Sequence, residues 1–104
     1  MRTLHHFGII TDTIPEGAFY NDDLGVWLTD ISKSPNKIEF LKFEPGSCMP
    51  ELVQKQAHIA YVVQSLEEEL KGKKVIFGPM ALDEHLSIAF IEEEGISVEL
   101  MEMK

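Results

Sequence analysis

The sequence is poor in cysteine, in basic residues and in long apolar runs. Among its 104 residues, Cys48 is the only cysteine, which excludes an intrachain disulfide and a multi-thiolate zinc site. Lys and Arg number 9 against 18 Asp and Glu, and the formal charge is -9. Because nucleic acids and anionic membranes bind basic surfaces, this charge argues against both as the main partner.

The sequence also lacks the signals of export, membrane insertion and disorder. No apolar run approaches the roughly 20 residues of a membrane span, and residues 1–10 do not have the pattern of a signal peptide. Hydrophobic residues make up 44% of the chain and charged residues 26%, close to the averages for globular proteins. We therefore expect a cytoplasmic protein with a single domain over residues 1–104.

The two halves of the chain repeat a strand pattern. His6 and His58 each begin a β-branched and aromatic run of strand length. Seven residues later, Thr13 and Ser65 each open a capping box, a hydroxyl residue followed three positions on by Glu. The repeat predicts one helix in each half, over residues 14–23 and 66–71.

Strand-like segments follow each predicted helix. They cover residues 26–31 and 37–43 in the first half, and 74–77, 86–91 and 96–103 in the second. The sequence therefore predicts repeat modules of about 1–48 and 53–104, with the first module one strand poorer than the second.

His6 and His58, which start the two repeats, each have a small neighbour on the same face of the predicted strand. Because strand side chains alternate between faces, His6 shares its face with Gly8, and His58 shares its face with Ala60. These small neighbours leave room above the sheet. The same alternation places His5 on the face opposite to His6.

Each half also carries one glutamate inside an apolar strand, Glu39 in the first and Glu99 in the second. A carboxylate in such a row is costly unless it is paired, protonated or bound to a metal. Together with His6 and His58, these two glutamates form a plausible site for one divalent ion. A mixed set of nitrogen and oxygen ligands suits Co, Ni, Mn, Zn or Fe better than Ca.

Several segments match, in order, the motifs of one superfamily. The first motif is a histidine before an apolar-Gly-apolar stretch, at residues 5–9. The others are the segments 19–25, 38–47, 58–70 and 89–100. With these segments, which span nearly the whole chain, the sequence resembles the vicinal oxygen chelate superfamily. That superfamily contains glyoxalase I and methylmalonyl-CoA epimerase.

The resemblance implies an α+β fold of two βαβββ modules, which form a curved, partly open mixed β-barrel with helices on the outside. It implies one metal ion in the concavity, with His6, Glu39, His58 and Glu99 as ligands. It also implies that Glu39 and Glu99 are the candidates for the catalytic base, and that the protein is a homodimer.

The function that this resemblance implies is a divalent-metal-dependent isomerase or lyase. Such an enzyme stabilises an enolate and moves a proton next to the carbonyl of a small-molecule substrate, as methylmalonyl-CoA epimerase and lactoylglutathione lyase (glyoxalase I) do. One alternative is a non-catalytic small-molecule-binding protein of the bleomycin-resistance type. A ring-cleaving dioxygenase is a third reading, in which Glu39 would be a surplus carboxylate. The only basic cluster for a CoA phosphate is Lys71, Lys73 and Lys74.

Overall fold

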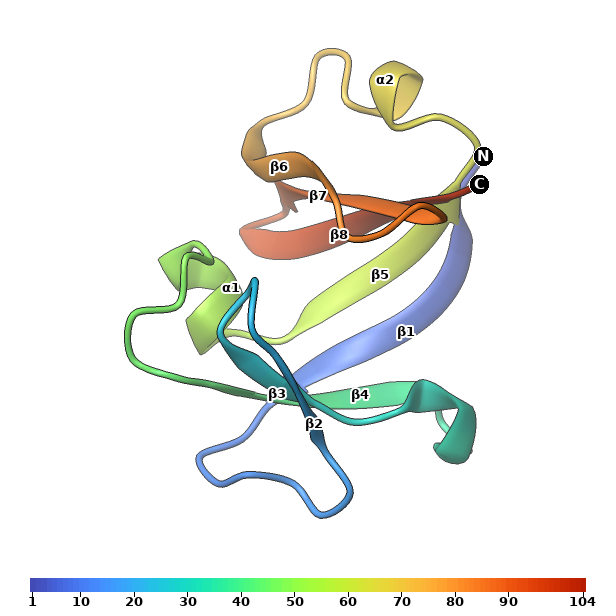
Figure 1. Cartoon of the computed structure of the whole chain (residues 1–104). Coiled ribbons are helices and arrows are strands. Elements are labelled where there is room, and N and C mark those ends of the chain that lie inside the picture. The colour runs from blue at the N-terminus through green and yellow to red at the C-terminus, as the bar shows by residue number, and fades with distance from the viewer.

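The computed structural model describes residues 1–104, which form one eight-stranded mixed sheet that curls around a concave face (Figure 1). The strands lie in the order β2-β3-β4-β1-β5-β8-β7-β6. They are β1 (Thr3–Ile10), β2 (Phe19–Asn21), β3 (Val26–Leu28), β4 (Ile38–Phe43), β5 (His58–Val63), β6 (Val75–Ala81), β7 (Leu86–Glu93) and β8 (Ile96–Met103). The predicted α+β class and curved mixed sheet are confirmed.

Helical structure is limited to three short segments. They are the 3-10 helix η1 (Ile31–Lys33) and the α-helices α1 (Glu51–Lys55) and α2 (Leu66–Glu69). Neither α-helix is long and apolar enough to cross a membrane. The segment α1 lies between the two halves of the chain and was not predicted from the sequence.

The sheet is built from two halves with the same path. In the first half β1 pairs in parallel with β4, and in the second β5 pairs in parallel with β8. Each half then continues outward through two further strands, to β2 and to β6. The halves join at the centre through the antiparallel pair of β1 and β5, so that the histidine-bearing strands of both repeats are neighbours.

The helix predicted over residues 14–23 does not form. Its second part is β2, which pairs with β3 and places Tyr20 against Trp27, with ring centroids 5.1 Å apart. Gly17 adopts a positive φ of 78°, outside the helical range, and Asn21 accepts the Leu24 N–H at 3.0 Å to close the β2–β3 turn. The first half is therefore short of a helix and not, as predicted, of a strand.

The second half agrees more closely with the sequence. Strand β8 has the predicted bounds, β7 is two residues longer than predicted, and β6 extends to Ala81. Helix α2 begins after Ser65, whose side chain accepts the Glu68 N–H at 3.2 Å as the capping box requires. The Leu66 N–H donates to Glu102 Oε1 at 2.8 Å, which ties the start of α2 to β8.

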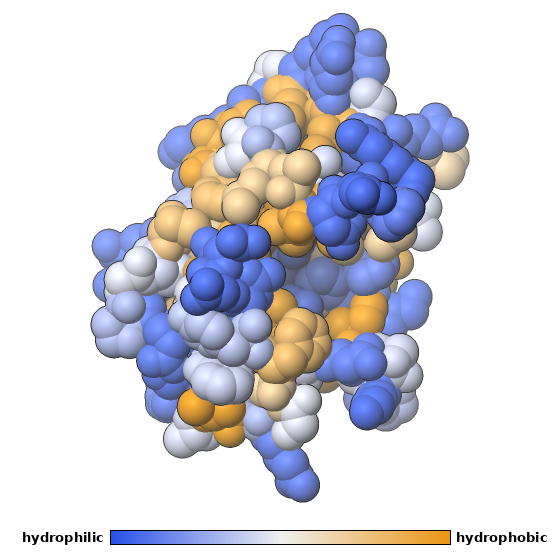
Figure 2. All heavy atoms as spheres, viewed as in Figure 1, coloured by the Kyte–Doolittle hydropathy of each residue, from blue (hydrophilic) through white to orange (hydrophobic).

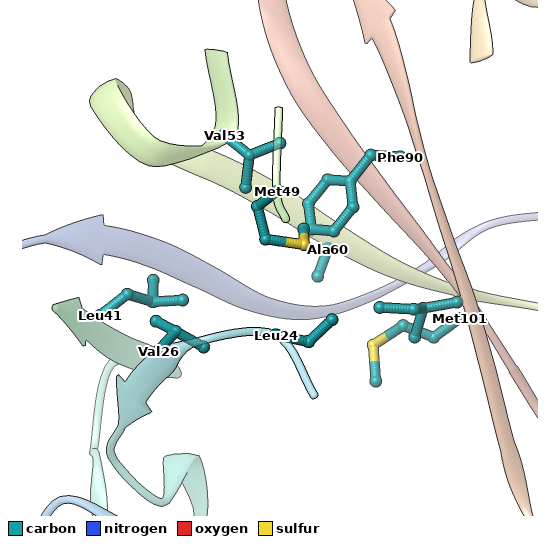
Figure 3. Packing of buried hydrophobic residues seen from close by; sticks show 9 residues of the cluster. Leu24, Val26, Leu41, Met49, Val53, Ala60, Phe90 and Met101 are labelled. Carbon is teal, nitrogen blue, oxygen red and sulfur yellow. The ribbon is translucent and has the colours of Figure 1, made fainter. Parts of the chain in front are cut away.

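Buried apolar side chains lie on both faces of the sheet. Between the two halves, the concave face carries a cluster that includes Leu24, Val26, Leu41, Met49, Val53, Ala60, Phe90 and Met101 (Figure 3). A second cluster lies on the outer face of the second half, where Leu66 of α2 packs with Val63, Ala89, Ile91, Val98 and Leu100. The polar residues predicted for the site lie on the concave side, between apolar neighbours.

Candidate metal centre

The four predicted ligands come from the four central strands of the sheet. His6 lies on β1, Glu39 on β4, His58 on β5 and Glu99 on β8. The strand register brings them to adjacent positions, because Gly8 of β1 pairs with both Glu39 and His58. Ala60 of β5 pairs in turn with His6 on one side and with Glu99 on the other.

The side chains of these residues converge on one point. A ring nitrogen of His6, a ring nitrogen of His58 and a carboxylate oxygen of Glu39 all lie within 4.8 Å of one another. Glu99 Oε1 lies 3.4 Å from His6 Nε2 and 3.1 Å from His58 Nε2, and Glu39 Oε1 lies 3.3 Å from His6 Nε2. The fold thus brings together all four residues that the sequence singles out.

The donor atoms of both histidines suit a metal ion. His6 and His58 are only 3% and 2% exposed, and the Nε2 atom of each is buried without a hydrogen-bond partner. Buried polar nitrogens rarely remain unpaired. Two imidazole nitrogens and two carboxylates are the donor set that Zn, Co, Ni, Mn or Fe accepts. The residues present therefore fit a divalent cation, although their role as ligands stays a prediction.

Gly8 provides the space that His58 occupies. A Cβ built on Gly8 would lie 2.1 Å from Cε1 of the His58 ring, far inside van der Waals contact. The other side of the ring lies edge-on to Phe90, with centroids 5.3 Å apart. The imidazole of His58 is therefore positioned by the missing side chain on β1 and by an aromatic ring on β7.

The pKa values indicate that a positive charge is favoured between the carboxylates. Burial lowers the pKa of His6, but the neighbouring carboxylates of Glu39 and Glu99 outweigh burial and raise it to about 9. Burial raises the pKa of Glu99, but His58 and His6 outweigh this effect and lower it to about 2. Without a metal ion, the proton on His6 supplies this charge, and a divalent cation held by these residues would take its place.

His5 lies on the same side as His6, and the prediction that it faces away was wrong. Between Leu4 and His6 the pairing of β1 with β5 shifts by one residue. Such a bulge interrupts the alternation of side chains. As a result His5 lines the same cavity, with Nδ1 2.8 Å from Nδ1 of His6. The sequence alone contains no signal for this irregularity.

The contact between His5 and His6 orients the more deeply buried ring, that of His6. Burial and the neighbouring His6 lower the pKa of His5, whereas the carboxylates raise the pKa of His6. Because a protonated imidazole carries an N–H on both nitrogens, the His6 Nδ1–H donates and the neutral His5 ring accepts. This leaves Nε2 as the His6 nitrogen that faces the carboxylates. A hydrogen bond to the outer nitrogen of a ligating histidine commonly fixes its tautomer and ring orientation, and we assign this positioning role to His5.

The four converging residues lie in a cavity of about 600 Å³. Its walls are mainly apolar and come from both halves, with Val26, Leu28 and Phe43 on one side and Ile88, Phe90 and Met101 on the other. In Figure 2 hydrophobic residues border a hollow between the two halves of the molecule. The cavity is of the size and character that proteins use for small ligands.

Two solved structures share this fold. One is a hypothetical protein from Bacillus halodurans C-125, with a TM-score of 0.68 and 24% identity, covering 99% of this chain and 95% of that chain. The other is methylmalonyl-CoA epimerase from Mycobacterium tuberculosis, with a TM-score of 0.65 and 20% identity, covering 98% of this chain and 88% of that chain. No protein-family model and no curated protein matches the chain. At these identities the likeness shows the fold alone.

Proposed function

We propose that the protein is a divalent-metal-dependent isomerase or lyase that moves a proton at the carbon next to a carbonyl. The observation that carries this proposal is the pair of buried, unpartnered Nε2 atoms that face two carboxylates at the base of a cavity. His6, His58, Glu39 and Glu99 would hold the ion. When bound, a divalent cation polarises a substrate carbonyl and lowers the energy of the negative charge that develops on its oxygen.

The two glutamates differ in their freedom to carry a proton. Glu99 Oε1 lies 3.4 Å and 3.1 Å from the Nε2 atoms of the two histidines, and its low pKa makes it a weak base. Glu39 lies within ion-pair distance of His6 only, and its side chain is 19% exposed against 10% for Glu99. We therefore assign the proton transfer to Glu39, and to Glu99 the role of neutralising the centre.

The remaining walls of the cavity exclude water and orient the substrate. Apolar side chains around the polar base lower the local dielectric, which strengthens each electrostatic interaction with the reacting atoms. Phe90 and Met101 lie on the wall beside His58 and Glu99. These residues would hold the apolar part of a substrate while its carbonyl faces the centre.

Incorporation of solvent deuterium tests the proton transfer. Protein loaded with Co or Mn is incubated in deuterium oxide with thioesters and hemithioacetals, and mass spectrometry measures deuterium at the carbon next to the carbonyl. We expect incorporation with the wild type and a loss of about 100-fold or more in Glu39→Gln. The control is Glu51→Gln, which changes an exposed carboxylate on α1.

The second candidate is a non-catalytic binding protein with the same cavity, favoured by the mainly apolar walls. Metal uptake without deuterium incorporation in any carbonyl compound would contradict the enzyme and support this candidate. The homodimer that the resemblance implies remains a prediction, which sedimentation equilibrium would check.

A further inference from the structure

The cavity around the candidate metal centre has no lysine or arginine in its wall. Apart from its histidines, the ionisable groups of the wall are four carboxylates, those of Glu39, Glu99, Asp30 and Asp83. The same cavity contains the buried, unpartnered Nε2 atoms of His6 and His58, so these carboxylates line a cavity that already holds a polar centre.

Two of the four carboxylates remain unbalanced when the centre is occupied. A divalent ion would cancel the charges of Glu39 and Glu99, which leaves Asp30 and Asp83. Each uses Oδ1 to accept one backbone N–H, from Ser32 at 2.9 Å and from His85 at 2.6 Å. Both residues are exposed, and no ion pair involves either of them.

The two aspartates reach the cavity from opposite halves. Asp30 follows β3, and Asp83 lies in the turn between β6 and β7. Lys33 is close enough to Asp30 to influence its pKa, but it does not line the cavity. The wall of the cavity therefore presents two further carboxylates to a ligand and no lysine or arginine.

The basic cluster of the chain is already paired elsewhere. Lys71 Nζ lies 3.0 Å from Glu68, Lys73 Nζ lies 3.2 Å from Glu93, and Lys74 Nζ lies 3.0 Å from Glu92. None of the three lines the cavity. An acyl-CoA carries several phosphate charges, and methylmalonyl-CoA carries a carboxylate as well, so this chain offers such a ligand no unpaired cationic cluster.

We propose that the cavity selects a small carbonyl compound that has an apolar body and a cationic group, and that it rejects acyl-CoA and other anionic substrates. The apolar body would occupy the walls described above, and the cationic group would lie near Asp30 and Asp83. This inference rests on the proposed function for the carbonyl, whereas the charge preference follows from the wall residues alone.

A series of probes with one apolar body and different charges tests the preference. Phenylbutylamine, phenylbutanol and phenylbutyrate are titrated by calorimetry into the wild type at low ionic strength, where charge interactions are least screened. We expect the amine to bind about tenfold more tightly than the carboxylate. In the double variant Asp30→Asn/Asp83→Asn, the preference for the amine over the carboxylate should fall about fivefold.

The matched control removes two carboxylates away from the cavity, Glu51→Gln/Glu67→Gln, and should keep the wild-type preference. Three results would overturn the inference: equal or tighter binding of the carboxylate, an unchanged preference in the Asp30/Asp83 variant, or no amine binding at millimolar concentration. Metal content is measured on the same samples. A protein that binds metal but prefers the anion contradicts this inference alone, whereas one that prefers the amine but binds no metal contradicts only the proposed function.

Discussion

The two halves of the sheet carry similar inner faces and different outer faces. On the inner side each half contributes one histidine and one glutamate to the same centre. On the outer side, α2 covers the second half, whereas no helix covers the first, and Phe7 and Phe40 there are each 37% exposed. The comparison indicates that the site requires both inner faces, and that the covering helix serves the packing of the second half.

Gly8 and Ala60 provide the sharpest test of the inner faces, because each lies two residues after the histidine of its half. Gly8→Ala would drive a methyl group into the His58 ring, so we expect a loss of about 1–3 kcal/mol of stability and at least about tenfold weaker metal binding. Ala60→Gly should cost only about 1 kcal/mol and leave metal binding within about twofold. Urea denaturation and Co titration measure both quantities, and equal metal affinity in the two variants would contradict this account of Gly8.

The outer faces differ in how much an apolar side chain contributes to the free energy of unfolding. Ile91 is 0% exposed in the cluster under α2, so Ile91→Ala should destabilise the protein by about 2–5 kcal/mol. Phe7→Ala removes a larger side chain from the uncovered face and should cost about 1 kcal/mol. Urea denaturation of the two variants checks the order, and a larger loss for Phe7→Ala would show that the outer face of the first half is covered in solution.

The two predicted capping boxes, at Thr13 and Ser65, allow the halves to be compared at the level of local structure. The Ser65 side chain caps α2, and Ser65→Ala should therefore cost about 1 kcal/mol. No helix follows Thr13, so Thr13→Ala should change the free energy of unfolding by less than about 0.5 kcal/mol. Thermal denaturation distinguishes the two, and an equal loss would mean that the segment after Thr13 is helical.

An ionic cluster around Arg2 joins the halves and should depend on pH. Arg2, which precedes β1, donates to Glu93 at 2.8 Å and to Glu69 at 3.1 Å. Arg2 and, to a smaller extent, Lys73 outweigh burial and lower the pKa of Glu93 from 4.5 to about 2. A lowered carboxyl pKa stabilises the fold above pH 4.5, and the stabilisation is lost as the pH falls toward 2.

Glu93→Gln should therefore lower the free energy of unfolding by about 1 kcal/mol at pH 7. The difference from the wild type should shrink between pH 4.5 and pH 2. Glu51→Gln, which breaks the exposed Lys55 pair, should cost less than about 0.5 kcal/mol. Urea titrations at several pH values measure these differences, and a gap that widens in acid would contradict the assigned pair.

The sequence predicts the regular strands of this fold better than its irregular segments. Strict alternation in residues 37–43 and 96–103 places Glu39 and Glu99 correctly, because a regular strand fixes the face of every side chain. Local irregularities defeat the same reasoning. The capping box at Thr13 precedes no helix because Gly17 leaves the helical range, and a bulge turns His5 toward the site.

The metal content of histidine variants from each half tests the central claim most directly. Elemental analysis is applied to the wild type, His6→Ala and His58→Ala after exposure to Co or Zn, with circular dichroism as the check of folding. His85→Ala, in the exposed turn before β7, is the control. The account predicts about one ion per chain in the wild type and the control, and none in either site variant. Retention of the ion by His6→Ala or His58→Ala, or a folded wild type that takes up no divalent metal, would contradict a centre shared by the two halves.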